Sequence, residues 1–298
     1  MTISGFSYVR NGFDYDVPFL ESIQSILPIC DEFIVAVGDS TDGTRESIVA
    51  LNSPKIKIVD TVWDMNMQKG GKIFAQQSNT ALDHITGDWA FHIQADEVIH
   101  ENDLDKVVNA IKENEHNSKL DGFLFPFIHF WGGYSYVRTS RRVHKNEIRV
   151  FRNDKCVRSY NESQGFRIYS SKEAYDAGVE KGEKLRVKLL DVPIYHYNGV
   201  HRPENLLKKI EKLSSFFHNG KAAVVEDIET VLQQVDRVEP FKGTHPKVMQ
   251  EKVASQDWTF TFDPKKAVWT KPKDKFLQPI EDFLGFRLGG YKNYKLIK

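Results

Sequence analysis

The first hundred residues alternate short apolar runs with segments of helical periodicity, and this alternation restricts the fold more than any other feature of the sequence. Apolar runs predict strands at 3–9, 33–37, 56–59 and 89–93, the second of them the uninterrupted sequence FIVAV. The stretches between them space their apolar residues as amphipathic helices do, with short links on both sides. This repetition predicts an α/β fold with a mainly parallel central sheet and helices on both faces.

In a parallel sheet, ligands bind just beyond the carboxyl ends of the strands. Four segments occupy these positions, and three of them carry acids: YVRNG, GDSTDGT, DTVWD and QADE. Asp96 and Glu97 directly follow the fourth strand, where carboxylates can hold Mg²⁺ or Mn²⁺ beside a diphosphate. Diphosphate is a poor leaving group until its charge is neutralised, so the pattern favours transfer from a nucleotide-activated substrate.

Other polar residues are candidates for the same edge. His196, in IYHYNGVHRPE, follows a strand and precedes a helix, although a histidine between two tyrosines is commonly a hydrogen-bonded core residue. GDSTDGT can present backbone N–H groups and carboxylates to a nucleotide, although Asp42 as a helix cap explains much of this segment. Lys69 and Lys72, around KGGK, could reach phosphates as point charges. The sequence lacks a P-loop and a GxGxxG motif, which argues against a dinucleotide enzyme.

Composition excludes some classes of protein. The chain of 298 residues has 41 Lys+Arg and 41 Asp+Glu, so it lacks the basic excess of a nucleic-acid-binding protein. Its two cysteines, Cys30 and Cys156, suit a reducing compartment. The first residues do not resemble a signal peptide, and no apolar run approaches the roughly 20 residues of a spanning helix. These features predict a cytoplasmic location.

The second half of the chain is less regular. We expect a catalytic domain over residues 1–218. Its first half, about 1–100, would bind the nucleotide-activated donor, and its second half, about 101–218, would bind the acceptor of the transferred group. A C-terminal extension over 219–298 would pack on this domain. An aromatic segment could form either an acceptor wall or a core hairpin: Phe130, Trp131, Tyr134 and Tyr136.

The tail from Lys265 holds nine Lys/Arg against three acids, interleaved with aromatic residues. This composition allows peripheral contact with the inner face of the membrane, where a lipid-linked acceptor would be found. The alternative, which the sequence favours, is that the tail packs on the catalytic domain and leaves its lysines in water. The packed residues would be Phe283, Phe286, Leu288 and Tyr291.

Several of these segments together resemble the bacterial family 2 glycosyltransferases. The resemblance rests on FLESIQSILPICDEFIVAVGDSTDGT, GDWAFHIQADEVIHE, RVFRND and IYHYNGVHRPENLLKK, while FKGTHPKVMQ and GFRLGGYKNYKL are similar to a poorly characterised branch. It implies a GT-A type α/β fold and inverting transfer of a sugar from a nucleotide-diphosphate donor to a glycan or lipid-linked acceptor. It also implies Mg²⁺ or Mn²⁺ as cofactor.

The resemblance assigns roles to particular residues. Asp96 matches the metal-binding second acid of the family's DxD motif, and Gln94 replaces the first acid. A histidine near the end of the catalytic domain completes the metal shell in many GT-A enzymes, which implies His196. The general base follows an RLFR-like strand, here RVFR, and is therefore Glu162, with Asp154 as the second choice.

The nucleotide-binding residues are less well determined by the resemblance. The family has a base-reading acid at the end of its second strand, where this chain has Val37, so Asp39 and Asp64 are the candidates. Arg10 and Lys72 are further candidates for donor contacts. Two other functions stay open: a metal-dependent nucleotidyltransferase, for which Arg10 alone would grip a triphosphate, and a non-catalytic nucleotide-sugar binding protein.

Overall fold

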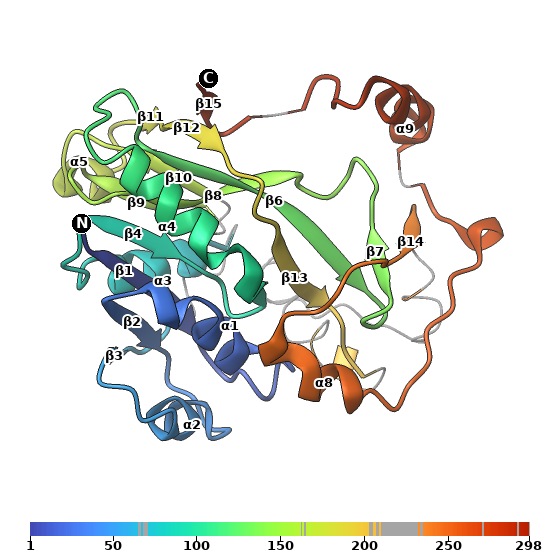
Figure 1. The fold of residues 1–298 in the computed structure, drawn as a ribbon, viewed down its shortest axis with the longest axis horizontal. Helices are drawn as coiled ribbons and strands as arrows, with labels where there is room; N and C mark the ends of the chain where they lie inside the picture. The colour runs from blue at the N-terminus through green and yellow to red at the C-terminus, as the bar shows by residue number, and fades with distance from the viewer. Residues whose placement is uncertain are drawn as a thin grey trace.

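The computed structural model describes residues 1–298 except 65, 66, 68–70, 162, 164, 203, 204, 207, 208, 210–231, 233, 234, 270, 291 and 298. Its centre is a mixed sheet whose main path runs β14-β7-β6-β8-β4-β1-β2-β3 (Figure 1). The last four are parallel: β1 (Ile3–Val9), β2 (Glu32–Val37), β3 (Ile56–Asp60) and β4 (Trp89–His92). The predicted parallel sheet is therefore present.

Alternate residues of the central strands enter two separate cores, as a sheet covered on both faces requires. In β2, Phe33, Val35 and Val37 pack on one side and Ile34 and Ala36 on the other. The first side is covered by α1 (Phe19–Ile26) and α4 (Leu104–Glu113), which lie on the near face of the sheet in Figure 1. The second is covered by α3 (Lys72–Leu82).

The acids near the starts of the first two helices have different roles. Helix α1 begins after Pro18 with no side-chain cap, and Asp16 lies instead 3.8 Å from the Nδ1 atom of His201. Gly43, in a left-handed conformation, holds the N-cap position of α2 (Thr44–Ala50), while Asp42 Oδ1 accepts a hydrogen bond from the Thr44 N–H at 3.1 Å, so the predicted capping role of Asp42 is present. The Asp42 carboxylate accepts hydrogen bonds from the backbone N–H groups of Phe13 and Asp14, so it joins two loops at the carboxyl edge.

The long strand β6 (Gly122–Trp131) organises the second half of the sheet. It pairs along its first half with β8 (Asn146–Arg152) and β12 (Arg186–Leu189), and along its second half with β7 (Tyr136–Arg138) and β13 (Ile194–Gly199). Strand β13 also pairs antiparallel with β5 (Glu97–Ile99), which immediately follows Asp96. This pairing brings the His196 segment back to the end of β4.

Smaller elements complete the fold. A separate sheet contains β9 (Val157–Tyr160), β10 (Gly165–Ile168) and β11 (Glu183–Lys184), beside α5 (Lys172–Asp176). The C-terminal region provides β14 (Val238–Pro240), which pairs with β7, and β15 (Lys295–Leu296), which pairs with β12. It also contains α8 (Gln250–Ala254) and α9 (Pro272–Leu284).

The prediction that four residues of the tail pack on the catalytic domain was wrong for two of them. Phe283 and Phe286 are exposed, whereas Leu288 is half-buried and Tyr291 lies outside the described residues. Among the described residues, no helix combines the length and the apolar character needed to cross a bilayer.

Candidate active site at the carboxyl edge of the sheet

Asp96 and His196 come together at the carboxyl edge of the sheet. The Asp96 Oδ2 and His196 Nε2 atoms are 3.4 Å apart, and the Tyr197 N–H donates to the Asp96 carbonyl at 2.8 Å. Burial of Asp96 opposes its ionisation, but the interactions with His196 and Lys209 outweigh this effect and hold the carboxyl pKa well below its ordinary value. An ionised carboxylate therefore faces an imidazole nitrogen, a pair of ligands that divalent cations accept.

His129 determines which nitrogen of His196 faces Asp96. The His129 Nε2 atom lies 2.7 Å from the His144 carbonyl, which can only accept, so Nε2 carries hydrogen. Burial lowers the pKa of His129 to about 3, so the ring is neutral and its Nδ1 atom is an acceptor. The His196 Nδ1 atom, 2.8 Å away, must then be the donor. Nε2 is therefore the nitrogen of His196 that faces Asp96: it can donate to the carboxylate, and it can bind a cation there once it has lost its hydrogen.

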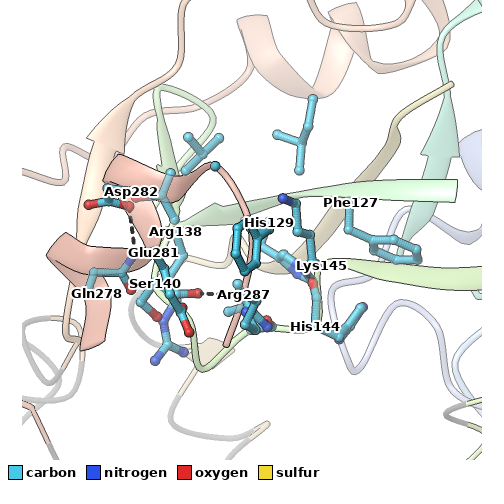
Figure 2. Close-up of a pocket in the computed structure, with 16 residues that line it drawn as sticks. Phe127, His129, Arg138, Ser140, His144, Lys145, Gln278, Glu281, Asp282 and Arg287 are labelled. Carbon is cyan, nitrogen blue, oxygen red and sulfur yellow. Dashed lines mark hydrogen bonds between the residues drawn. The ribbon is translucent and has the colours of Figure 1, made fainter. Parts of the chain in front are cut away.

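A third histidine stands beside this pair. One nitrogen from each of His129, His144 and His196 can be chosen so that the three lie within 4.8 Å of one another. Figure 2 shows His129 and His144 on the wall of a pocket of about 400 Å³. Because both nitrogens of His129 are engaged in hydrogen bonds, the Asp96–His196 pair suits a cation better than the histidine cluster does.

Glu97, the neighbour of Asp96, has a structural role. Its two oxygens receive the guanidinium of Arg149, with Nε to Oε2 at 2.7 Å and Nη2 to Oε1 at 2.5 Å, and both side chains are buried. A buried pair of this kind is strongly destabilising when one partner is removed, because the other charge stays uncompensated. Of these two adjacent acids, Asp96 is therefore available to bind a ligand, whereas Glu97 is bound to Arg149 in the core.

The replacement of the first motif acid by Gln94 has a physical reason in the structure. The Gln94 amide nitrogen donates to the backbone carbonyl of Ser163 at 3.1 Å, a bond that a carboxylate could not make. Ser163 is buried, and its hydroxyl accepts a hydrogen bond from Ser159 Oγ at 3.2 Å. Gln94 therefore connects the acidic loop to the segment after β9. Glu162, the predicted base, precedes Ser163 and lies outside the described residues.

Asp154, the second choice for the base, lies at the opposite edge of the sheet. Strand β8 is antiparallel to β4, and its last residue, Arg152, pairs with Trp89 at the start of β4. The Asn153 N–H donates to the Asp88 carbonyl at 2.9 Å, so the following residue stands at the amino end of the parallel strands. Asp154 is exposed there, with the length of β4 between it and Asp96.

Arg10 and Asp39 meet at the carboxyl ends of β1 and β2. The Arg10 Nε and Nη2 atoms donate to the two oxygens of Asp39 at 2.8 and 3.2 Å, and the guanidinium lies 5.7 Å from the Trp63 ring centroid. Burial disfavours the Asp39 carboxylate, but the Arg10 hydrogen bond overcomes this and lowers its pKa. A Cβ on Gly38 would lie 2.6 Å from Trp63 Nε1, so the close approach of the indole requires glycine there.

Two of the remaining nucleotide candidates are surface residues. Asp64 is exposed directly after the buried Trp63, and Lys72 is exposed at the first residue of α3. Lys69 lies outside the described residues. The structure thus brings the predicted metal ligands Asp96 and His196 together, and it pairs two separately predicted donor residues, Arg10 and Asp39; the donor contacts of Arg10, Asp39, Asp64 and Lys72 stay predictions.

Sequence reasoning missed Lys209, a buried cation near Asp96. Its Nζ atom donates to the Asn198 side-chain oxygen at 2.7 Å and lies 2.8 Å from His201 Nε2. Burial lowers the Lys209 pKa to about 8, while the carboxylates of Asp96 and Asp16 act in the opposite direction. Lys209 is one of two adjacent lysines in ENLLKK, and nothing in that sequence distinguishes it from a solvated surface residue.

The aromatic segment, for which two interpretations were open, lies largely in the core. Phe130 is buried and stacks on Tyr197 with ring centroids 4.6 Å apart, and Tyr134 is buried as well. The Trp131 indole N–H donates to the Leu232 carbonyl at 3.0 Å. Strands β6 and β7 pair antiparallel here, so the segment is a hairpin, with Phe130 and Tyr134 in the core and Trp131 and Tyr136 half-buried.

The parallel strands β1 to β4, with helices on both faces, agree with the predicted GT-A type α/β fold. The family model described as Glycosyl transferase family 2 matches residues 17–172, just over half of the chain, and the chain belongs to this family. It is therefore a glycosyltransferase, as the sequence predicted, and the nucleotidyltransferase alternative is not supported. A search of curated proteins finds no match to this chain.

Solved structures show more distant likenesses. The chain is similar to S. aureus TarS 1-349, with 15% identity, 78% of this chain and 70% of that chain covered, and a TM-score of 0.38. The same protein in complex with UDP-GlcNAc gives 14% identity, 78% and 71% coverage and a TM-score of 0.38. Glucosyl-3-phosphoglycerate synthase from Mycobacterium tuberculosis, in complex with Mn²⁺, UDP and phosphoglyceric acid, gives 18% identity, 43% coverage of each chain and a TM-score of 0.29. The family assignment rests on the family match rather than on these structures.

Proposed function

We propose that the protein is an inverting, metal-dependent glycosyltransferase that moves a sugar from a nucleoside-diphosphate sugar to an acceptor hydroxyl. The observation that carries the proposal is the Asp96–His196 pair, with Oδ2 and Nε2 3.4 Å apart. Two ligands of an octahedral Mg²⁺ or Mn²⁺ lie about 3 Å from each other, so the pair needs little adjustment to bind one ion. The bound cation would neutralise charge on the departing diphosphate.

Nearby residues would support this pair in different ways. His129 holds the His196 ring so that Nε2 is turned to Asp96. Lys209 places a buried amine close enough to Asp96 for each group to shift the pKa of the other. The Arg10–Asp39 pair lies at the neighbouring strand ends, where the nucleotide of the donor would bind, with Asp64 and Lys72 as further donor contacts.

The transfer would be a single in-line displacement. The acceptor oxygen forms a bond to C1 of the sugar while the bond from C1 to the diphosphate oxygen breaks, and its electron pair leaves with the diphosphate. The acceptor proton passes to Glu162, and the configuration at C1 is inverted. The Gln94–Ser163 hydrogen bond supports this role for Glu162, because it fastens the next residue of the chain to the acidic loop.

We also propose the division of the chain into a catalytic domain over 1–218, with donor and acceptor halves of about 1–100 and 101–218, and an extension over 219–298. The pairing of β14 with β7 and of β15 with β12 supports an extension that packs on the catalytic domain.

A donor screen tests the proposed function. Sugar nucleotides of UDP, GDP, CMP and dTDP are added with and without Mn²⁺, and the melting temperature is followed. A donor at about a hundred times its Kd stabilises the folded state by about 2.7 kcal/mol, a readily measured shift. We expect one nucleotide class to stabilise the protein, and to do so only with Mn²⁺. Turnover of that donor distinguishes an enzyme from a binding protein, and no response to any donor would contradict the proposal.

A further inference from the structure

Helix α9 lies with its polar side against the protein and its apolar side in solvent. Gln278 and Glu281 are each only 7% exposed, whereas Phe276 is 72% and Phe283 is 89% exposed. A helix on the surface of a globular protein normally has the opposite orientation, with the apolar stripe inward. The outer side of α9 therefore needs an explanation other than packing within this chain.

The inner side of α9 is held by charge pairing. Arg141 donates to Asp274 Oδ1 at 3.1 Å and lies 3.2 Å from Glu281 Oε1, and its backbone N–H donates to Gln278 Oε1 at 2.6 Å. Asp282 pairs with Arg237. Figure 2 shows Gln278, Glu281 and Asp282 on the pocket side of the helix. All three acids of α9 are thus paired with arginines of the rest of the chain.

The outer side of α9 combines apolar residues with unbalanced lysines. Phe276, Ile280 and Phe283 follow one another at intervals of four and three, so they share one face with Leu284. Ile280 and Leu284 are exposed, and so is Phe286 just beyond the helix. The lysines at the start of the helix are exposed as well: Lys271, Lys273 and Lys275.

We propose that this outer face of α9, with Phe276, Ile280 and Phe283 at its centre, docks on the surface of a membrane rich in anionic lipid. Apolar side chains enter the boundary between head groups and acyl chains, and lysines beside them are attracted to anionic head groups. The acids of the helix oppose this attraction little because each is paired with an arginine: Asp274 and Glu281 with Arg141 on the inner side, and the more exposed Asp282 with Arg237. A second copy of the chain fits less well, since a symmetric contact would bring the same lysines together.

Docking would also place a cavity at the membrane. Phe286 and Arg287 line both the pocket of about 400 Å³ that contains His129 and an adjoining cavity of about 1010 Å³. The same short segment that carries the exposed face thus borders the space beside the candidate site. A membrane-bound acceptor could enter this space without leaving the bilayer surface.

The test is sedimentation of the full chain with vesicles of phosphatidylcholine alone or of equal parts phosphatidylcholine and phosphatidylglycerol. We expect binding to the anionic vesicles, weakened by added salt. Phe276→Ser combined with Phe283→Ser should reduce the partition coefficient for these vesicles roughly tenfold or more. Val49→Ser combined with Val179→Ser, which changes similarly exposed apolar residues elsewhere, should bind like the wild type.

Each outcome has a defined meaning. All four substituted side chains are exposed, so both double variants should melt at the wild-type temperature. Wild-type protein that stays in the supernatant with both vesicle types, or a Phe276/Phe283 variant that binds normally, would overturn the proposal. A wild-type dimer that becomes monomeric on these two substitutions would instead assign the face to a second copy. Because the assay contains no donor, its result is independent of the proposed sugar transfer.

Discussion

His129 and His196 face each other across the pairing of β6 with β13, with their Nδ1 atoms 2.8 Å apart. The direction of this hydrogen bond follows from the His144 carbonyl on the far side of His129, which accepts from Nε2. Two successive hydrogen bonds, from His129 to the His144 carbonyl and from His196 to His129, therefore fix the His196 ring so that its Nε2 atom faces Asp96. Partners behind a metal ligand fix its tautomer and ring orientation in this way.

We expect His129→Phe to weaken Mn²⁺ binding about 10- to 100-fold, because the ring that accepts from His196 is lost. His129→Asn keeps an acceptor oxygen near the position of Nδ1 and should recover most of the affinity. Calorimetric titration with Mn²⁺ and the nucleoside diphosphate measures the difference. Melting in EDTA is the control, and equal losses of affinity in both variants would show that the bond to His196 does not matter.

Asp96→Asn and Glu97→Gln should have different effects, because the first residue is proposed to bind the cation and the second stabilises the fold. Asp96→Asn should abolish turnover and the Mn²⁺-dependent rise in melting temperature. Glu97→Gln should lower the free energy of unfolding by up to about 3–5 kcal/mol, because Arg149 loses its buried counter-charge. Urea unfolding in EDTA and donor-dependent melting measure the two effects. A Glu97→Gln protein of normal stability would refute the structural role of this acid.

Glu162→Gln should leave donor affinity unchanged and reduce the transfer rate roughly 10²- to 10⁴-fold, the range for a positioned general base. Asp154→Asn is the matched control, since Asp154 stands at the amino end of β4 and should not affect transfer. Single-turnover kinetics with saturating donor measure the chemical step. A large loss in the Asp154 variant together with normal transfer by the Glu162 variant would reverse the two assignments.

Glu147→Gln should change how stability depends on pH. Burial raises the pKa of the Glu147 carboxyl to about 8, with Arg149 acting against this rise and Glu97 adding to it. The unfolded chain releases this proton near its ordinary pKa of 4.5, so between there and about pH 8 the folded state binds more protons and loses stability as pH rises. The neutral glutamine removes this loss.

Urea unfolding at a series of pH values between about 5 and 8 measures this dependence. The Glu147→Gln protein should show the smaller decrease in stability and should be the more stable of the two near the upper limit. Parallel profiles for variant and wild type would mean that Glu147 is ionised in the folded protein.

The sequence was sufficient for those parts of the fold that depend on local patterns. The strand FIVAV is β2, and the QADE segment follows β4 at the carboxyl edge, because uninterrupted apolar runs and strand-end acids are short-range signals. His129 could not be found in this way. It lies within GFLFPFIHFW, which resembles core sequence, and it acquires its partner His196 only when β6 and β13 pair. The orientation of α9 was missed because its acids pair with distant arginines, Arg141 and Arg237.

The hydrogen bond from Gln94 to the Ser163 carbonyl has a consequence for how each substrate affects the binding of the other. It ties the loop that carries Asp96 to Ser163 in the segment that follows β9, so a substrate that binds to one of them also acts on the other. Such coupling is reciprocal: if the donor increases the affinity for the acceptor by some factor, the acceptor increases the affinity for the donor by the same factor. If the donor binds at the Asp96 loop and the acceptor beside Ser163, as the proposed function has it, this single side-chain amide predicts cooperative binding of the two substrates, at the position where the family motif has an acid.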